Sequence, residues 1–191
     1  MIKNIIAKII NFIVERFPDR QSLLGVYAVI VFLVYSWTLL ISFYKLPSWA
    51  LFLTTGQILS IYAYAFSVNL AESLFVLLGL LFLDYTIFLL LRNKEEFQLR
   101  SLLITVILLG SSMWRLVLFQ EYSNVSAFVG GELTWWAVTI TLGLPIAIFV
   151  PKVAIIRKIM RAFVDRTVIF LYVYLPLSFI SLIVVIIRNI Y

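Results

Sequence analysis

The chain has 191 residues, a hydrophobic fraction of 64% and a mean hydropathy of +1.11, whereas soluble domains are ~45–50% apolar. It carries 15 Lys and Arg against 9 Asp and Glu, and it contains neither cysteine nor histidine. These counts exclude disulfides, thiolate chemistry and histidine-based metal, haem or general-base sites. We therefore expect an all-α integral membrane protein with no catalytic, cofactor or metal site and no nucleic-acid partner.

The chain begins with an amphipathic segment. Its apolar side chains fall on one face of a helix, and its polar residues fall on the other: Asn4, Lys8, Asn11 and Glu15. Pro18 ends this pattern. Residues 1–20 are predicted to form an interfacial helix in the headgroup plane, or a helix docked against the protein's own bundle. Residues 21–191 are predicted to form one transmembrane helical domain.

Six apolar stretches follow, each near the ~20 residues with which a helix crosses ~30 Å of hydrocarbon. They are residues 22–44, 48–66, 70–91, 99–119, 133–150 and 167–187. These lengths predict a polytopic bundle of about six transmembrane helices.

The charge distribution favours a different number of membrane crossings, because residues 48–91 contain no Lys or Arg. The polar midpoint of that segment, residues 67–73, is either a tight turn between two spans or part of a re-entrant loop. Six spans place nine basic residues on one side and five on the other. With five crossings, twelve basic residues lie on one side of the membrane and two on the other. The positive-inside rule then predicts that the N-terminus is inside. Length favours six helices and charge favours five, so the orientation stays open.

Small residues and prolines mark the later stretches. Thr139, Gly143 and Ala147 recur every four residues, which predicts a close helix contact within one chain or between chains. Pro145 and Pro176 lie inside the fifth and sixth stretches and predict helix kinks. Such kinks are found at the binding sites of transporters and also in static membrane helices.

Few ionisable residues fall within the stretches, where a central charge costs ~2.5–3.5 kcal/mol. We expect one polar cluster formed by Gln57, Glu72, Arg115 and Glu121. In this cluster Arg115 reaches toward Glu72 or Glu121, either in a polar cavity or as a structural ion pair. Asp84 is expected to be an isolated intramembrane acid.

A second amphipathic segment, residues 151–166, links the last two stretches. Its basic residues form the densest positive patch of the chain: Lys152, Arg157, Lys158, Arg161 and Arg166. A patch at the membrane edge attracts acidic lipids by ~1 kcal/mol per basic residue. The alternative is a topology signal without a specific ligand.

No catalytic motif is found in the sequence. The first function class is therefore a non-catalytic membrane subunit that anchors or assembles a larger complex. The second is a small oligomeric channel or transporter. The third is a lipid-modifying enzyme that uses Glu72, Asp84 and Arg115. The expected partners are membrane lipids, including anionic ones, and other membrane subunits or further copies of the chain.

Overall fold

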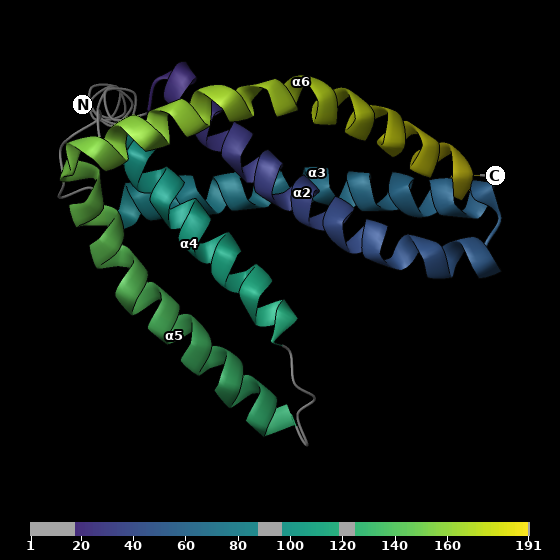
Figure 1. Ribbon diagram of the computed structural model, residues 1–191, viewed down its shortest axis with the longest axis horizontal. Coiled ribbons are helices and arrows are strands. Elements are labelled where there is room, and N and C mark those ends of the chain that lie inside the picture. The colour runs from purple at the N-terminus through teal and green to yellow at the C-terminus, as the bar shows by residue number, and fades with distance from the viewer. Residues whose placement is uncertain (1–17, 88–96, 119–124, 191) are drawn as a thin grey trace, which may run out of the picture.

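The computed structural model describes residues 18–87, 97–118 and 125–190, which form helices and contain no strand. In chain order the helices are α2 (Arg20–Phe52), α3 (Thr55–Ile87), α4 (Phe97–Val117), α5 (Val125–Phe149), the short 3₁₀ helix η3 (Val150–Lys152) and α6 (Ala154–Ile190) (Figure 1). The all-α prediction is confirmed for these ranges. The predicted amphipathic helix of residues 1–17 lies outside the described residues.

Within the described ranges, five helices are long and apolar enough to cross a membrane. The expected count of six is not confirmed, because α3 runs without interruption through residues 67–73, where a turn or a re-entrant loop was expected. Asn69 and Ser73 are buried within this stretch. Ser73 also donates a hydrogen bond to the carbonyl of Leu70, 2.9 Å away. The polar residues are therefore accommodated inside one helix.

The same continuity holds in α2, which passes through Pro47 and ends at Phe52. The break expected between the first two apolar stretches is therefore absent. Helix α2 begins at an N-cap, where the Asp19 carboxylate accepts a hydrogen bond from the Ser22 backbone N–H at 3.1 Å. The hydrogen bonds to Ser22 hold the pKa of Asp19 below its ordinary value.

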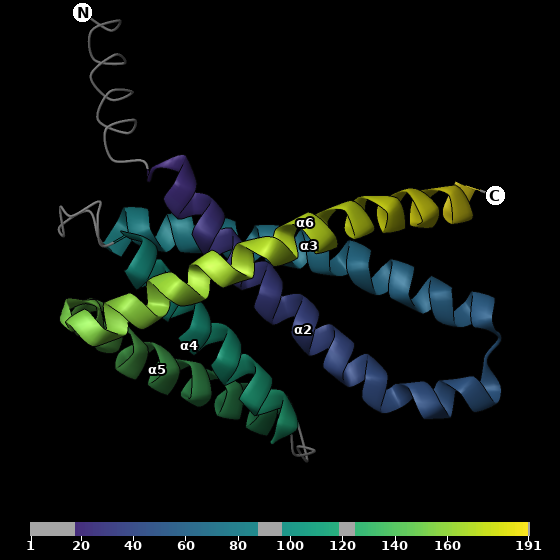
Figure 2. The same ribbon diagram turned by 45° about the horizontal axis from the view of Figure 1, so that its top comes forward.

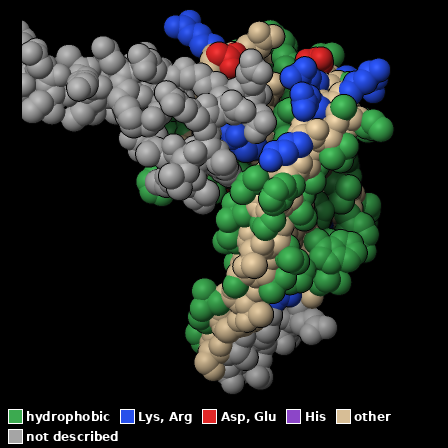
Figure 3. Space-filling model, turned by 90° about the vertical axis from the view of Figure 1, so that its left-hand side faces the viewer, with side chains coloured by type: hydrophobic (Ala, Val, Ile, Leu, Met, Phe, Trp, Pro, Cys, Tyr) green, Lys and Arg blue, Asp and Glu red, His purple; other side chains and the backbone are tan. Residues whose placement is uncertain are grey.

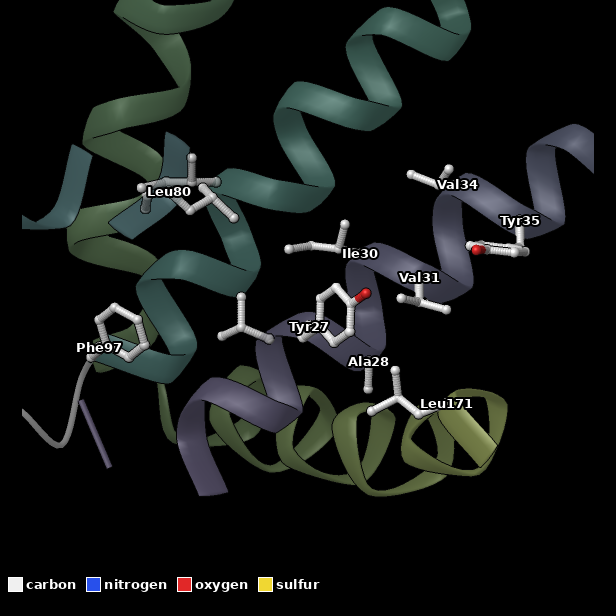
Figure 4. Packing of buried hydrophobic residues seen from close by; sticks show 12 residues of the cluster. Tyr27, Ala28, Ile30, Val31, Val34, Tyr35, Leu80, Phe97 and Leu171 are labelled. Atoms are coloured by element: carbon white, nitrogen blue, oxygen red, sulfur yellow. The ribbon is translucent and has the colours of Figure 1, made fainter. Parts of the chain in front are cut away.

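Helix α2 is the central helix of the molecule. Half of its most apolar segment is buried, against 17% for α3 and for α6 and 11% for α5. Its side chains form the core with residues of α3, α4 and α6 (Figure 4), and the labelled members are Tyr27, Ala28, Ile30, Val31, Val34, Tyr35, Leu80, Phe97 and Leu171. Helices α3, α4 and α6 therefore pack around α2, while α5 packs against α4.

Helices α4 and α5 form a hairpin that slants away from α3 and α6 (Figures 1 and 2). All buried residues of α4 lie between Phe97 and Thr105, so only the first half of α4 enters the core. The second half lies beside α5, where a Cβ on Gly143 would stand 2.9 Å from Ile107 Cγ2. Ala147 is fully buried. The predicted small-residue stripe is thus a close contact within one chain.

Helix α6 joins the second amphipathic segment to the last apolar stretch in one helix of 37 residues. Met160 and Val164 pack against α2 and α4, while Ile155 and Ile159 stay exposed. Only part of the expected apolar face is therefore docked. Pro145 and Pro176 lie inside α5 and α6 without breaking them, and α6 follows an arc (Figure 1), as expected for a proline near the middle of a helix.

Five crossings would determine which connections share a side of the membrane. The start of α2, the α3–α4 connection and η3 would then lie on one side, and the α2–α3 connection and the end of α6 on the other. A hydrogen bond from the Tyr64 hydroxyl to Asn189 Oδ1, 3.2 Å long, joins α3 to the end of α6. Apart from Arg115, which lies well inside α4, the basic residues would then divide twelve to two, and the positive-inside rule predicts an N-terminus on the inner side.

Single-cysteine labelling checks this topology, because the native chain contains no cysteine. Thr54→Cys and Asn189→Cys should react with a membrane-impermeant maleimide from the outer side, and Lys158→Cys from the inner side. Asn69→Cys should react from neither, since Asn69 is buried within α3. Ready labelling at position 69 would restore the six-span topology.

The close contact of α4 with α5 predicts that Gly143→Ala destabilises the protein. The added methyl group would force Ile107 to move, at about 1–3 kcal/mol, while the gain in helix propensity is at most about 1 kcal/mol. Gly110→Ala on α4 is the matched control, because its Cβ would meet nothing within 4 Å. Thermal unfolding in one detergent compares the two, and equal melting temperatures would contradict the contact.

Candidate functional site: polar groups inside the helix bundle

Polar side chains of α2, α3 and α6 meet inside the bundle and form the central polar seam, defined here as Tyr27, Tyr35, Thr38, Asn69, Ser73 and Ser178. The Tyr35 hydroxyl makes a short hydrogen bond with the Ser178 hydroxyl and lies 3.4 Å from the carbonyl oxygen of Phe66. Its ring stacks on Tyr174 with 4.7 Å between centroids. Tyr35 therefore connects all three helices.

Two further hydrogen bonds of the seam join α2 to α3. Thr38 donates to Asn69 Oδ1 at 3.1 Å, and the Tyr27 and Ser73 hydroxyls lie 3.3 Å apart. The Asn69 Nδ2 atom is buried without a hydrogen-bond partner, a state that costs about 1–3 kcal/mol. The central polar seam holds hydroxyls and one amide but no charged group, so it binds helices together without offering an acid or a base.

A second set of polar contacts joins α4 to α5 and forms the hairpin seam: Ser111, Arg115, Glu132, Trp135 and Thr139. Arg115 contacts Glu132 Oε1 through Nη2 at 2.9 Å and through Nε at 3.0 Å, and lies 5.6 Å from the Trp135 ring centroid. Trp135 Nε1 donates to Ser111 Oγ at 2.8 Å, and Ser111 lies 2.8 Å from Thr139 Oγ1. The guanidinium charge is thus balanced inside the hairpin.

Of the polar cluster expected from the sequence, Gln57, Glu72 and Arg115 lie in the described part of the chain, while Glu121 lies outside it, so the cluster stays a prediction. Arg115 forms an ion pair with Glu132, which was not among the expected residues. Glutamate 132 was missed because it was placed at the edge of an apolar stretch starting at 133. Helix α5 begins earlier, at Val125, which puts Glu132 about two turns inside the helix.

Gln57 has a different role from the one expected. The Thr54 backbone N–H donates to Gln57 Oε1 at 2.8 Å, and the Gln57 N–H donates to Thr54 Oγ1 at 3.4 Å. This reciprocal pair is a capping box at the start of α3. The Thr-x-x-Gln spacing in the sequence was the signal that could have revealed it.

Glu72 lies near the middle of α3 and is exposed. No ion pair or hydrogen bond is recorded for its side chain within the described part of the chain. Asp84 lies close to the C-terminal end of α3, and its side chain is outside what the structure describes. Glu72 is therefore an exposed carboxylate in an otherwise uncharged length of helix.

The five residues of the expected headgroup patch are all exposed: Lys152, Arg157, Lys158, Arg161 and Arg166. The Lys152 ammonium lies 5.2 Å from the Phe149 ring centroid, and Arg157 Nε donates to the Pro151 carbonyl at 3.3 Å. Figure 3 shows Lys and Arg side chains gathered at one end of the molecule beside a long hydrophobic surface. The patch is accessible to headgroups, and lipid binding stays a prediction.

The opposite end carries an open groove with a volume of about 380 Å³, lined by Leu53, Gln57, Ser60, Ile61, Tyr64 and Arg188. Arg188 is the one charged residue that lines this groove, and no acidic residue lies beside it there. The lining therefore does not suit catalysis. In the part of the chain that is described, no three metal-ligating side chains lie together.

The ion pair of the hairpin seam predicts a coupled pair of substitutions. Arg115→Leu leaves Glu132 without its counter-charge at a side-chain exposure of 24%. We expect this variant to be about 1–2 kcal/mol less stable than Arg115→Leu/Glu132→Gln. The control is Arg115→Leu/Glu72→Gln, which should not regain stability. Rescue by Glu72→Gln instead of Glu132→Gln in thermal unfolding would refute the pairing.

Comparison of the chain with protein-family models, with curated proteins and with solved structures finds no match. The functional conclusion therefore depends on the arrangement of the residues described above.

Proposed function

We propose that this chain is a non-catalytic membrane subunit that assembles with another membrane protein. The observation that carries the proposal is the contrast between the inside of the bundle and its surface. Inside, polar side chains bond one helix of the chain to another. Outside, Glu72 and broad apolar surfaces of α3, α5 and α6 face away from the bundle.

The chemistry of the two seams supports a structural role over an enzymatic one. The central polar seam contains hydroxyl and amide groups that are engaged with neighbouring helices. In the hairpin seam, the guanidinium of Arg115 and the carboxylate of Glu132 neutralise each other. A general acid or base needs a free titratable group within reach of a substrate, and neither seam offers one.

The packing around α2 supports a subunit over a pore inside one chain. Val26, Ile30 and Tyr35 are fully buried where α2 meets its neighbours. Side chains therefore fill the centre of the bundle, so a solute path would have to run between chains. The second function class, an oligomeric channel or transporter, thus becomes one outcome of the test below.

The charges at the two ends support a fixed orientation for this subunit. Five crossings place twelve basic residues on the inner side and two on the outer side. The exposed patch at the start of α6 then faces the inner leaflet, where acidic lipids attract it. The patch would hold the inner ends of α5 and α6 at the headgroups.

Purification from the membranes of the cells that naturally make the chain tests the proposal. In a mild detergent we expect a complex in which the 22.1 kDa chain and a different membrane protein occur at a fixed ratio, as measured by native mass spectrometry. The purified chain alone should carry no ion flux in vesicles. A ring of identical chains that conducts ions would contradict the subunit proposal and establish the channel instead.

A further inference from the structure

We propose that the outer face of α3 around Glu72 binds a transmembrane helix of another protein, and that this helix carries a Lys or Arg side chain near the middle of the membrane. The inference depends on the proposed function and identifies the surface and the chemistry of the partner. The α3 outer face is defined by Val68, Glu72, Phe75, Gly79 and Phe82, which follow one another at three- and four-residue steps along the helix.

The depth of Glu72 is the first argument. It lies 17 residues after the start of α3 and 15 before its end, or ~25 and ~22 Å along the axis. Uncharged residues occupy α3 from Thr55 to 71 and from 73 to 83. A Glu side chain is shorter than the Lys and Arg side chains that snorkel to the headgroups. Its carboxylate can therefore stay charged in the hydrocarbon region only beside a cation.

The shape of the face is the second argument. Phe75, one turn from Glu72, is 73% exposed, and Phe82 continues the apolar surface farther along the helix with 68% exposure. A Cβ on Gly79, two turns along from Glu72, would meet no atom within 4 Å. A small residue beside a polar one lets a second helix backbone come close, which is how helices associate in lipid. The face thus combines an unpaired charge with room for a helix.

Charge complementarity excludes a second copy as the occupant. Among the described residues of α4, Arg115 is engaged with Glu132, and Arg100 is buried near the start of the helix. Lys45 lies seven residues before the end of α2, at ~10 Å from that end, whereas Glu72 lies ~25 Å from the same side of the bundle. A symmetric dimer keeps depths equal in both copies, so Lys45 would miss Glu72 by ~15 Å. Since no cation of the described residues besides the engaged Arg115 fits the depth of Glu72, we place the cation on a different chain.

Photocrosslinking tests the partner directly. The photoreactive residue p-benzoylphenylalanine replaces Phe75 in the full chain, made in its own cells, and the crosslinked peptide is identified by mass spectrometry. We expect one membrane protein, crosslinked within a transmembrane helix that contains Lys or Arg near its centre. Exchange of the charges, with Glu72→Lys in this chain and the partner's cation replaced by Glu, should restore an association that either change alone removes.

Two variants and a matched control measure the contribution of the face. Glu72→Leu removes the charge and should reduce recovery of the partner about tenfold, the change that corresponds to ~1.4 kcal/mol. Gly79→Leu should reduce recovery similarly by filling the space beside the charge. Gly56→Leu is the control on the same helix. It is equally open but lies ~160° around the helix from Glu72, so it should leave recovery unchanged.

The outcomes separate this inference from the proposed function. Neither Glu72→Leu nor Gly79→Leu should lower the melting temperature of the purified chain, so loss of the partner cannot be ascribed to unfolding. A partner that is recovered equally with all variants would overturn this inference and leave the subunit proposal standing. Crosslinks to a second copy, to lipid alone or to a helix without a basic residue would also overturn it. Absence of any partner for the wild-type chain would overturn both.

Discussion

The hydrocarbon interior of a membrane offers polar groups no hydrogen-bond partner, and the architecture of this chain depends on that constraint. Every backbone group in a span must bond within its own helix, which favours long uninterrupted helices. Side-chain groups must find partners within their own helix or on neighbouring helices. Tyr35 and Asn69 do so across α2, α3 and α6, while Arg115 and Glu132 do so within the α4–α5 hairpin. These polar contacts therefore largely determine how the helices are arranged.

This constraint explains which parts of the fold could be predicted. The all-helical class and the apolar stretches follow from hydropathy, and the stripe that contains Gly143 follows from its spacing. Residues 67–73 resemble a turn because Ser and Asn favour turns in water. Inside a bundle, Ser67 instead bonds the Ala63 carbonyl at 2.8 Å, and Asn69 bonds Thr38. The absence of Lys and Arg from residues 48–91 was the sequence signal that favoured five crossings.

The candidate site was less predictable, because pairing depends on where helices begin. Arg115 was identified as a residue that needs a partner, but α5 starts before the apolar stretch that marks it, and so Glu132 was left outside the expected cluster. Gln57 was expected in the cluster, and in the structure its side chain caps α3. Glu72 was expected as one of two alternative partners of Arg115, the other being Glu121. Its exposure on α3 became visible only once the inward face of that helix was known.

The central claim is that the charge of Glu72 is balanced by another protein rather than within this chain. A cryo-electron microscopy map of the complex purified from native membranes tests it most directly. The account predicts an unbroken α3 with the Glu72 carboxylate within ~4 Å of a Lys or Arg nitrogen of a different chain. A map in which α3 is intact while Glu72 faces lipid or a second copy of the same protein would contradict it.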